Sequence, residues 1–190
     1  MRKIIVTMWI SLDGFISGPN NDMSFVGEFY DEAMGRYETD IVSAADTLLL
    51  GRETYQSFAG AWPHVPNNPN ASQGEIEYAN IVNAMHKIVF SRTLESADWN
   101  SSKLEREIVA TEIEKLKNEE GRDILIYGSA SIVQALTRLG LIDEYQLLIH
   151  PVVLGSGKSL FGDNKVKLKL SNTKTHPSGV VIHYYELAEK

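Results

Sequence analysis

The sequence predicts an α/β fold in which a mainly parallel sheet is covered by helices on both faces. Short apolar runs typical of buried strands alternate with segments whose apolar residues recur at helical spacing, the pattern of parallel-sheet proteins. The last two apolar runs, within residues 165–187, have no helix between them, so we expect the sheet to end in antiparallel strands. No repeat, low-complexity segment or domain boundary is evident, and residues 1–190 are predicted to form a single domain.

The predicted strands are apolar runs bounded by polar or turn-forming residues. They cover residues 3–10, 47–50, 87–91, 108–110, 124–127 and 144–154, followed by two strands within 165–187. The predicted helices cover residues 25–45, a brief segment through 55–58, and the segments 72–85, 111–121 and 131–139. Polar and turn-forming residues predict loops at 11–22, 60–72 and 94–103.

Capping-box pairs mark three of the predicted helix starts. In such a pair, a Ser or Thr hydroxyl and a Glu or Gln side chain three residues later satisfy each other's free backbone N–H groups. The pairs are Ser72 with Glu75, Thr111 with Glu114, and Ser131 with Gln134. The last of these helices is expected to stop at Gly140, because glycine readily takes the left-handed conformation that ends a helix.

Composition and charge exclude several classes of protein. The chain has no cysteine, which excludes disulfides, thiolate metal sites and cysteine nucleophiles. Its five histidines show no ligand spacing, so no metal site is predicted, and the absence of a GxSxG motif leaves a hydrolase without support. The formal net charge of −7 argues against a nucleic-acid partner. Without a signal-peptide pattern or a run of membrane-spanning length, we expect a cytoplasmic protein with no membrane partner.

Residues 122–140, RDILIYGSASIVQALTRLG, carry the strongest functional signal of the sequence. Their apolar run ends at Gly128, and a helical pattern begins directly after it. A strand that turns into a helix start presents unpaired N–H groups and the positive end of the helix dipole, an arrangement that favours phosphate binding. Either Ser129 or Ser131 is a candidate cap for this helix. The alternative interpretation is an ordinary turn between a strand and a helix, without a ligand.

Three predicted strands end alike, in an apolar run followed by small or polar residues. These ends are LLLGRETY at 48–55, IVFSRTL at 88–94 and ILIYGSAS at 124–131. The carboxyl ends of parallel strands line one crevice, where ligands bind. Two of the ends supply arginines, Arg52 beside Thr54 and Arg92 beside Ser91. Each arginine alone is more often a surface or salt-bridge residue, but together the three ends favour a phosphorylated dinucleotide.

The same segments resemble a known family. GRETYQSF, FSRTL and YGSASIVQAL, with SLDGFISG near the start and LIDEYQLLIHPVVLGSGKSLF near the end, are similar to the dihydrofolate-reductase-like superfamily. The nearest branch is the reductase domain of bacterial riboflavin-biosynthesis deaminase–reductase proteins. The resemblance covers nearly the whole chain in the same order. It implies a three-layer α/β/α fold around a mixed sheet, NADPH as the hydride donor, and a homodimer.

The resemblance also implies which residues contact the cofactor. The 2′-phosphate of NADPH is expected near Arg52, Thr54, Ser91 and Arg92, with Gly51 also in contact. The pyrophosphate is expected at the turn after the central strand, formed by Tyr127, Gly128, Ser129 and Ala130. The family usually carries consecutive glycines in this turn, and here Ser129 replaces the second.

The nicotinamide and the substrate are expected beside the loop that follows the first strand, around Trp9, Ser11, Leu12, Asp13 and Gly14. Asp13 or water is the candidate proton donor, and the alternative role of Asp13 is to stabilise its own Asp-Gly turn. Lys158 is a candidate contact for a substrate phosphate or carboxylate, or else a solvated lysine. Dihydrofolate reductases carry their acidic residue on the first helix. Here Asp31 and Glu32 lie largely off the apolar stripe of that helix, so this role is not transferred to them.

The sequence therefore predicts an NADPH-dependent reductase that transfers a hydride to a C=N or C=O carbon of a small heterocyclic or sugar-phosphate substrate. A compound like 5-amino-6-(5-phosphoribosylamino)uracil is one such substrate, as in riboflavin biosynthesis. Because neither a fused deaminase domain nor its zinc motif is expected, a stand-alone paralogue with another substrate is also consistent with the sequence. The alternatives are a non-catalytic nucleotide-binding module, a dihydrofolate reductase, or an interaction protein that keeps only the fold.

Overall fold

An eight-stranded sheet forms the centre of the chain in a computed structural model that describes residues 1–188. The last two residues of the domain predicted over 1–190 lie outside the described residues. In chain order, the strands of the sheet are β1 (Ile4–Ser11), β3 (Ala45–Gly51), β4 (His86–Phe90), β5 (Ser102–Glu105), β6 (Asp123–Tyr127), β7 (Glu144–His150), β9 (Leu168–Thr175) and β10 (Val181–Leu187). Across the sheet their order is β5-β4-β3-β6-β1-β7-β10-β9.

Parallel pairing dominates this sheet. It joins β5, β4, β3, β6, β1 and β7 in turn. β10 pairs antiparallel with both β7 and β9, so the predicted mixed sheet with antiparallel C-terminal strands is confirmed. A second, two-stranded sheet pairs β2 (Phe15–Ser17), within the loop predicted at 11–22, with β8 (Lys158–Ser159).

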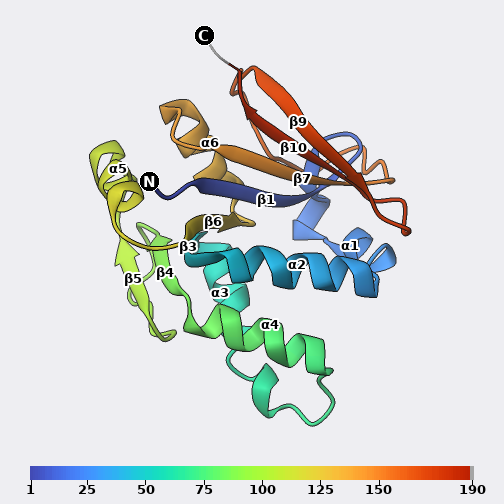
Figure 1. The fold of residues 1–190 in the computed structure, drawn as a ribbon, viewed down its shortest axis with the longest axis horizontal. Coiled ribbons are helices and arrows are strands. Elements are labelled where there is room, and N and C mark those ends of the chain that lie inside the picture. Colours follow the sequence, from blue (N-terminus) through green and yellow to red (C-terminus); the bar gives the residue numbers. More distant parts are fainter. Residues whose placement is uncertain (189–190) are drawn as a thin grey trace.

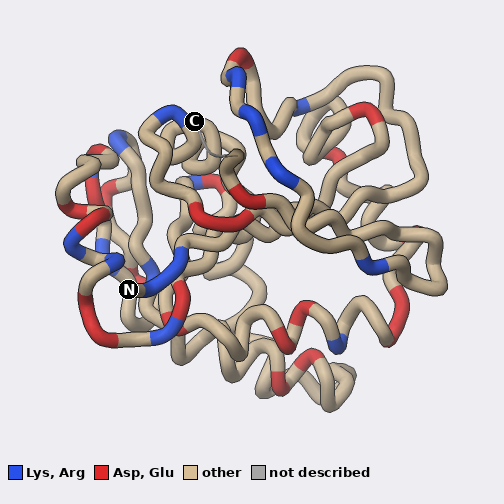
Figure 2. Tube along the Cα trace, turned by 45° about the horizontal axis from the view of Figure 1, so that its top comes forward, with Lys and Arg blue, Asp and Glu red and all other residues tan. Residues whose placement is uncertain are grey.

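Helices cover both faces of the sheet and complete the predicted three-layer α/β/α arrangement (Figure 1). In chain order they are α1 (Ser24–Glu28), α2 (Glu32–Ala44), α3 (Arg52–Ala61), α4 (Gln73–Ala84), α5 (Ala110–Asn118) and α6 (Ala130–Leu139), with 3-10 turns η1 (Pro19–Asn21) and η2 (Val65–Asn67). α5 and α6 pack on one face, while α2, α3 and α4 pack on the other. Acidic residues recur along α2, and one of them, Glu38, is buried (Figure 2).

The two layers of the core follow from the alternation of side chains along each strand. On β1, Val6 and Met8 pack in the cluster formed with α5 and α6, whereas Trp9 packs against the opposite cluster. On β3, Leu49 joins the first cluster and Leu48 the second. These inner strands are buried on both faces, which explains why they read as near-continuous apolar runs in the sequence.

The helix predicted over 25–45 is wrong as a single element. Asp31 interrupts it, because its carboxylate accepts the backbone N–H of Met34 at 2.8 Å and caps a new helix, α2. The segment before the break forms only the short helix α1. This break shifts the buried stripe of α2 to Met34, Tyr37, Glu38 and Val42.

The capping predictions had mixed outcomes. The capping box of Ser72 and Glu75 at the start of α4 is confirmed. The strand at 108–110 and the cap at Thr111 are wrong, because α5 already begins at Ala110. The nearby strand β5 begins at Ser102, near the end of the loop predicted over 94–103, and extends to Glu105. The cap at Ser131 is also wrong, since the N-cap of α6 is Ser129. Gly140 ends α6 in the left-handed conformation, as predicted.

The remaining boundaries differ from the prediction by a few residues. The strand predicted over 144–154 ends at His150, before Pro151. In the hairpin near the C-terminus, β9 begins at residue 168 and not at 165, and a turn through residues 177–179 joins it to β10. Among the helices of residues 1–188, none has the length and apolar character needed to cross a membrane.

Candidate functional site

A cavity of about 690 Å³, here called the main cavity, lies at the carboxyl ends of β1, β3 and β6. It is the crevice expected at the strand ends of a parallel sheet. The structure brings together there these residues of the predicted site: Trp9, Gly51, Arg52, Thr54, Tyr127, Gly128, Ser129, Ala130 and Lys158. The cavity is also lined by Ile16, Ser17 and Asn21, from the segment that the sequence predicts as a loop, and by Met23 directly after it.

Two helices start at the edge of the main cavity. α3 begins at Arg52 directly after β3, and α6 begins at Ala130 after the turn that follows β6. The first N–H groups of a helix have no intrahelical partner and carry the positive end of the helix dipole. This edge of the cavity is therefore suited to the negative charge of a phosphate group.

Ser129 links the two helix starts. Its hydroxyl accepts the backbone N–H of Gly51 at 2.8 Å and donates to the Thr54 hydroxyl, also at 2.8 Å. To reach them, Ser129 adopts a left-handed backbone with φ of 60°, directly after Gly128 with φ of 72°. A Cβ atom at Gly128 would lie only 3.0 Å from the Thr54 side chain, so a side chain at that position would also meet steric resistance.

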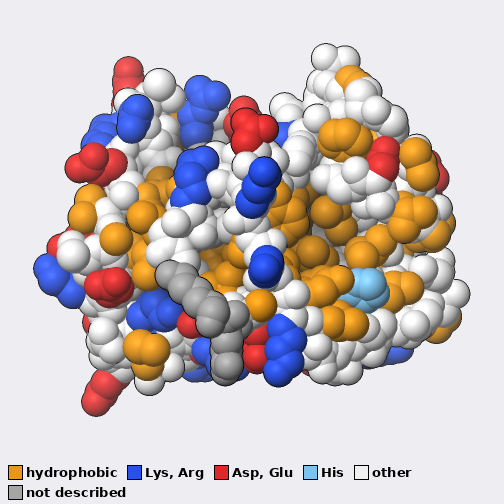
Figure 3. Space-filling view, turned by 90° about the horizontal axis from the view of Figure 1, so that it is seen from above, with side chains coloured by type: hydrophobic (Ala, Val, Ile, Leu, Met, Phe, Trp, Pro, Cys, Tyr) orange, Lys and Arg blue, Asp and Glu red, His pale blue; other side chains and the backbone are white. Residues whose placement is uncertain are grey.

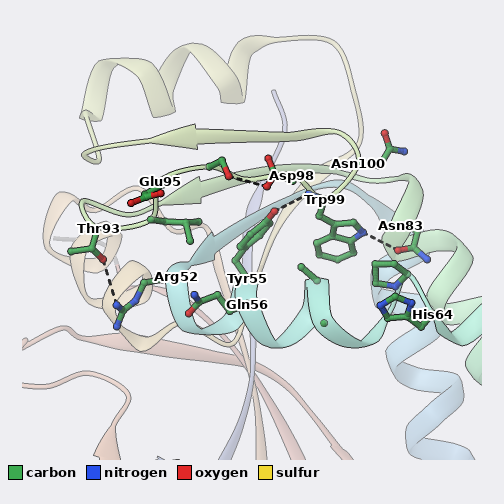
Figure 4. Close-up of a pocket in the computed structure, with 15 residues that line it drawn as sticks. Arg52, Tyr55, Gln56, His64, Asn83, Thr93, Glu95, Asp98, Trp99 and Asn100 are labelled. Atoms are coloured by element: carbon green, nitrogen blue, oxygen red, sulfur yellow. Dashed lines mark hydrogen bonds between the residues drawn. The ribbon is translucent and has the colours of Figure 1, made fainter.

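A second cavity, of about 1,020 Å³, lies beside the main cavity and is here called the outer cavity (Figure 4). It opens between α3 and the segment that follows β4. Arg52 lines both cavities, and its guanidinium lies 3.4 Å from the hydroxyl of Thr93. Trp99 lies further along the outer cavity, where its indole N–H donates to the Asn83 side chain at 2.9 Å.

The two predicted residues after β4 lie outside both cavities. Ser91 is buried, and its hydroxyl accepts the backbone N–H groups of Thr93 at 3.2 Å and Leu94 at 3.0 Å, so it shapes the turn. Arg92 is exposed and lines neither cavity. Thr93, which the sequence does not single out, occupies the cavity wall instead. Thr93 lies near Arg52 because the turn after β4 faces the turn after β3, an arrangement that no local sequence pattern specifies.

The loop after β1 is organised around Asp13. The Asp13 carboxylate accepts the hydroxyl of Ser11 at 2.7 Å and the backbone N–H groups of Leu154 at 3.1 Å and Gly155 at 2.7 Å. The bond from the Ser11 hydroxyl is the main cause that lowers the pKa of Asp13, and the two backbone bonds add to it. Asp13 therefore ties the first loop to the segment that leads into β8.

Asp13 does not line the main cavity, and neither do the predicted substrate contacts beside it in this loop. Ser11 is buried and also accepts the N–H of Phe15 at 3.0 Å. Leu12 is 66% exposed, and Gly14, with φ of 89°, closes the turn by donating its N–H to the Ser11 carbonyl. Among the residues predicted around the nicotinamide, the structure thus places Trp9 alone in the cavity wall.

Lys158 on β8 lies opposite the start of α3. Its ammonium group is 2.9 Å from the carboxylate of Glu53, and both residues line the main cavity. Their side chains are 44% and 56% exposed, so water screens the pair strongly. The ion pair keeps the Lys158 ammonium group at the rim of the cavity. This group lies between the first turn of α3 and the segment whose N–H groups are hydrogen-bonded to Asp13.

Glu38 is a functional candidate that the sequence analysis missed. This side chain on α2 is buried, and it accepts hydrogen bonds from the hydroxyls of Tyr127 at 2.7 Å and Tyr30 at 3.0 Å. Burial raises its pKa to about 7, although the hydrogen bonds act in the opposite direction. Glu38 lies four residues from Met34 and four from Val42, which places it on the buried side of α2. This spacing predicts its burial only when the start of the helix after Asp31 is known.

An α/β/α domain with a mixed sheet of this order, and with a ligand-sized cavity where its parallel strands end, has the dihydrofolate-reductase-like fold. The chain belongs to the RibD C-terminal domain family, whose model matches residues 2–184. This family contains reductase domains of the riboflavin-biosynthesis type.

The relatives support the same placement. The protein YyaP of Bacillus subtilis (strain 168) is 40% identical over 182 residues, which cover 95% of this chain and 92% of YyaP. A structure from Shewanella sp. PV-4, provisionally named as a riboflavin biosynthesis protein, is 19% identical, with a TM-score of 0.73 over 98% of this chain and 99% of that one. Acinetobacter baumannii RibD is 15% identical, with a TM-score of 0.72 over 100% of this chain and 59% of RibD. At these identities the two structures establish the fold alone.

Proposed function

We propose that the protein is an NADPH-dependent reductase that transfers a hydride to a small heterocyclic or sugar-phosphate substrate. The observation that carries this proposal is the position of Arg52. It stands at the first turn of α3 and lines both the main cavity and the outer cavity. A dinucleotide that extends from one cavity to the other would pass this guanidinium, which binds phosphate groups well.

The residues present fit such a cofactor. The turn of Gly128 and Ser129 leaves room beside the start of α6, where a pyrophosphate would accept backbone N–H groups of Ala130 and Ser131. Arg52 and Thr93 would hold the 2′-phosphate at the edge of the outer cavity. Trp9, Phe58 and Tyr127 would form the apolar wall for the nicotinamide ring at the other end.

The cofactor supplies the hydride when it is bound, and the chain has to align the two reactants and keep water out. The apolar wall of the main cavity excludes water from one side of the reaction site. Lys158, at its rim, would exchange its contact with Glu53 for a phosphate or carboxylate of the substrate. A substrate like 5-amino-6-(5-phosphoribosylamino)uracil carries such a phosphate. Water would supply the proton, because Asp13 does not line the main cavity and its lowered pKa keeps it ionised.

Titrations with NADPH and NADH, followed through tryptophan fluorescence, test the cofactor assignment. Each cavity contains a tryptophan, Trp9 in the main cavity and Trp99 in the outer one. We expect Arg52→Ala to weaken NADPH binding about tenfold while NADH binding changes less than twofold, because only NADPH carries the 2′-phosphate. Arg36→Ala is the matched control. Arg36 is also an exposed arginine in an ion pair, with Glu32 on α2, but it lines neither cavity.

The outcomes separate the candidate functions. Tight NADPH binding followed by cofactor oxidation with a ribosylamino-pyrimidine or a related compound supports the reductase. Binding without oxidation across the substrate panel would favour the non-catalytic nucleotide-binding module. Failure of both NADPH and NADH to bind would refute the proposal.

A further inference from the structure

Glu38 lies behind the wall of the main cavity, in a group of aromatic residues that we call the Glu38 cluster: Glu38, Tyr30, Tyr78, Tyr127 and Trp9. Glu38 is 6% exposed, and its carboxyl group joins α2 to the end of β6 through the hydroxyl of Tyr127 at 2.7 Å. A buried carboxyl with two hydroxyl donors is well hydrogen-bonded in either protonation state.

Tyr127 and Trp9 connect this carboxyl group to the cavity. Both residues line the main cavity, and their rings meet edge to face with centroids 5.6 Å apart. The ring of Tyr127 also packs against Phe58, another wall residue, at 5.8 Å. Because the Tyr127 hydroxyl is held by Glu38, the orientation of this wall depends on the buried carboxyl group.

Within residues 1–188, the negative charge of Glu38 has no partner cation. The groups that face it are the hydroxyls of Tyr30 and Tyr127, the indole of Trp9, and Tyr78 on α4. Around Tyr30 the further charges are Asp31 and Glu75, which are also negative. Among the described residues, no lysine or arginine contributes to the pKa of Glu38, which burial raises to about 7. The carboxyl group thus changes its charge near neutral pH.

We propose that Glu38 is a positioning residue of the main cavity, whose carboxylate favours the oxidised over the reduced nicotinamide through the wall of Trp9 and Tyr127. This inference rests on the proposed cofactor. A nicotinamide ring is neutral in NADPH and positively charged in NADP⁺, so a negative charge behind the wall attracts only the oxidised form. Deprotonation of Glu38 would therefore make hydride donation more favourable as the pH rises.

The ratio of the dissociation constants of NADPH and NADP⁺ measures this effect. Both nucleotides carry the same 2′-phosphate, which also titrates near pH 6, and its contribution cancels in the ratio. We expect NADP⁺ to gain roughly three- to tenfold in affinity relative to NADPH between pH 6 and pH 8 in the unmodified protein. In Glu38→Gln, the ratio should stay constant over this range, because glutamine keeps an oxygen acceptor and does not titrate.

Two further variants sharpen the test. Asp40→Asn removes one negative charge from the exposed side of the same helix and should leave the pH dependence of the ratio unchanged. Tyr127→Phe keeps the ring but removes the hydroxyl that stabilises the Glu38 carboxylate, so the midpoint of the pH dependence should move upward. Carboxyl ¹³C spectra of the protein without nucleotide should show a glutamate that titrates near neutral pH and is missing in Glu38→Gln.

The outcomes distinguish this inference from the proposed function. If neither nucleotide binds, the proposed function fails and the inference fails with it. If both bind with a ratio that does not depend on pH, or if Glu38→Gln keeps the dependence, the inference alone is overturned. Should Glu38→Gln fold poorly, the pH series of the unmodified protein and its ¹³C titration still decide.

Discussion

At the scale of single residues, Ser129 replaces a glycine of the family pattern and yet fits the turn through its hydroxyl. A left-handed backbone is unfavourable for a serine, by about 1 kcal/mol relative to glycine. Here the side chain bonds to both Gly51 and Thr54, each at 2.8 Å. The hydroxyl thus joins the starts of α3 and α6, which a glycine does not do.

Substitutions at Ser129 separate these two effects. Ser129→Ala loses both hydrogen bonds and keeps the backbone penalty, so we expect it to lower the free energy of unfolding by about 1–3 kcal/mol. Ser129→Gly loses the bonds but relieves the backbone, and should be about 1 kcal/mol more stable than Ser129→Ala. Urea unfolding of the three proteins checks this order. An alanine variant as stable as the glycine variant would contradict it.

Glu38 also makes the stability of the fold depend on pH. Its pKa is about 7 in the folded chain against an ordinary value of 4.5, so the folded state binds the proton more tightly. Its contribution to stability is therefore full below pH 4.5 and is lost as the pH rises through 7. Relative to Glu38→Gln, we expect the free energy of unfolding of the unmodified protein to fall by about 3 kcal/mol over this range.

Urea unfolding at pH 4.5, 6 and 8 measures this difference. The buried histidines His150 and His176 have lowered pKa values and act in the opposite direction, but they are present in both proteins and cancel in the comparison. A constant difference between the two proteins over the whole range would show that Glu38 does not titrate in the folded state.

At the scale of elements, the link between the first loop and the segment before β8 decides where Lys158 lies. Asp13 accepts the N–H groups of Leu154 and Gly155, and β2 pairs with β8 directly beyond. Gly157 packs so closely against Ser17 that a Cβ atom there would lie 2.0 Å from the Ser17 carbonyl oxygen. These contacts form one unit at the rim of the main cavity.

Two substitutions of Asp13 distinguish a structural tie from proton donation. Asp13→Asn keeps an oxygen acceptor, and with a structural role it should retain most of the turnover, whereas Asp13→Ala should expose the N–H groups of Leu154 and Gly155 to rapid hydrogen exchange. With a role as proton donor, both variants should lose turnover about equally. Hydrogen exchange and steady-state rates for the two variants together settle the role.

The sequence predicts these elements unevenly, for physical reasons. The unit of β6, Gly128 and α6 was predictable because its signals are local: an apolar run, a glycine and helical spacing. Glu38 was not, because the break at Asp31 changes which side of α2 is buried. The contact of Asp13 with Gly155 joins residues far apart in the chain, and no local pattern specifies such a pairing.

At the scale of the whole molecule, the C-terminal end of the sheet leaves apolar side chains partly open on the face that carries α6. On this face Tyr185 lies opposite Leu170, and Leu187 lies opposite Leu168. Leu170 is 50% exposed. Figure 3 looks onto this side of the molecule and shows hydrophobic side chains gathered in the open hollow beside a row of basic ones. We propose that a second copy of the chain covers this face in a homodimer.

Light scattering coupled to size-exclusion chromatography tests the dimer. Leu170→Lys places a charge on the apolar face and should shift the protein toward the monomer, because burying an unpaired charge is costly. Lys169→Glu is the matched control, since the neighbouring side chain points to the other face of β9. A monomer for the unmodified protein, or equal mass for all three, would refute this interface.

The position of Arg52 has an implication for how the family diversifies. The Arg52 side chain is half-exposed, and it contacts two other surface residues, Glu53 and Thr93, so its replacement disturbs little of the folded core. The residues that would face the reacting ring, Trp9 and Tyr127, belong to the interior. Mutations at Arg52 would thus change the preference between NADPH and NADH without altering the residues that face the nicotinamide. Laboratory evolution of cofactor preference should begin at Arg52.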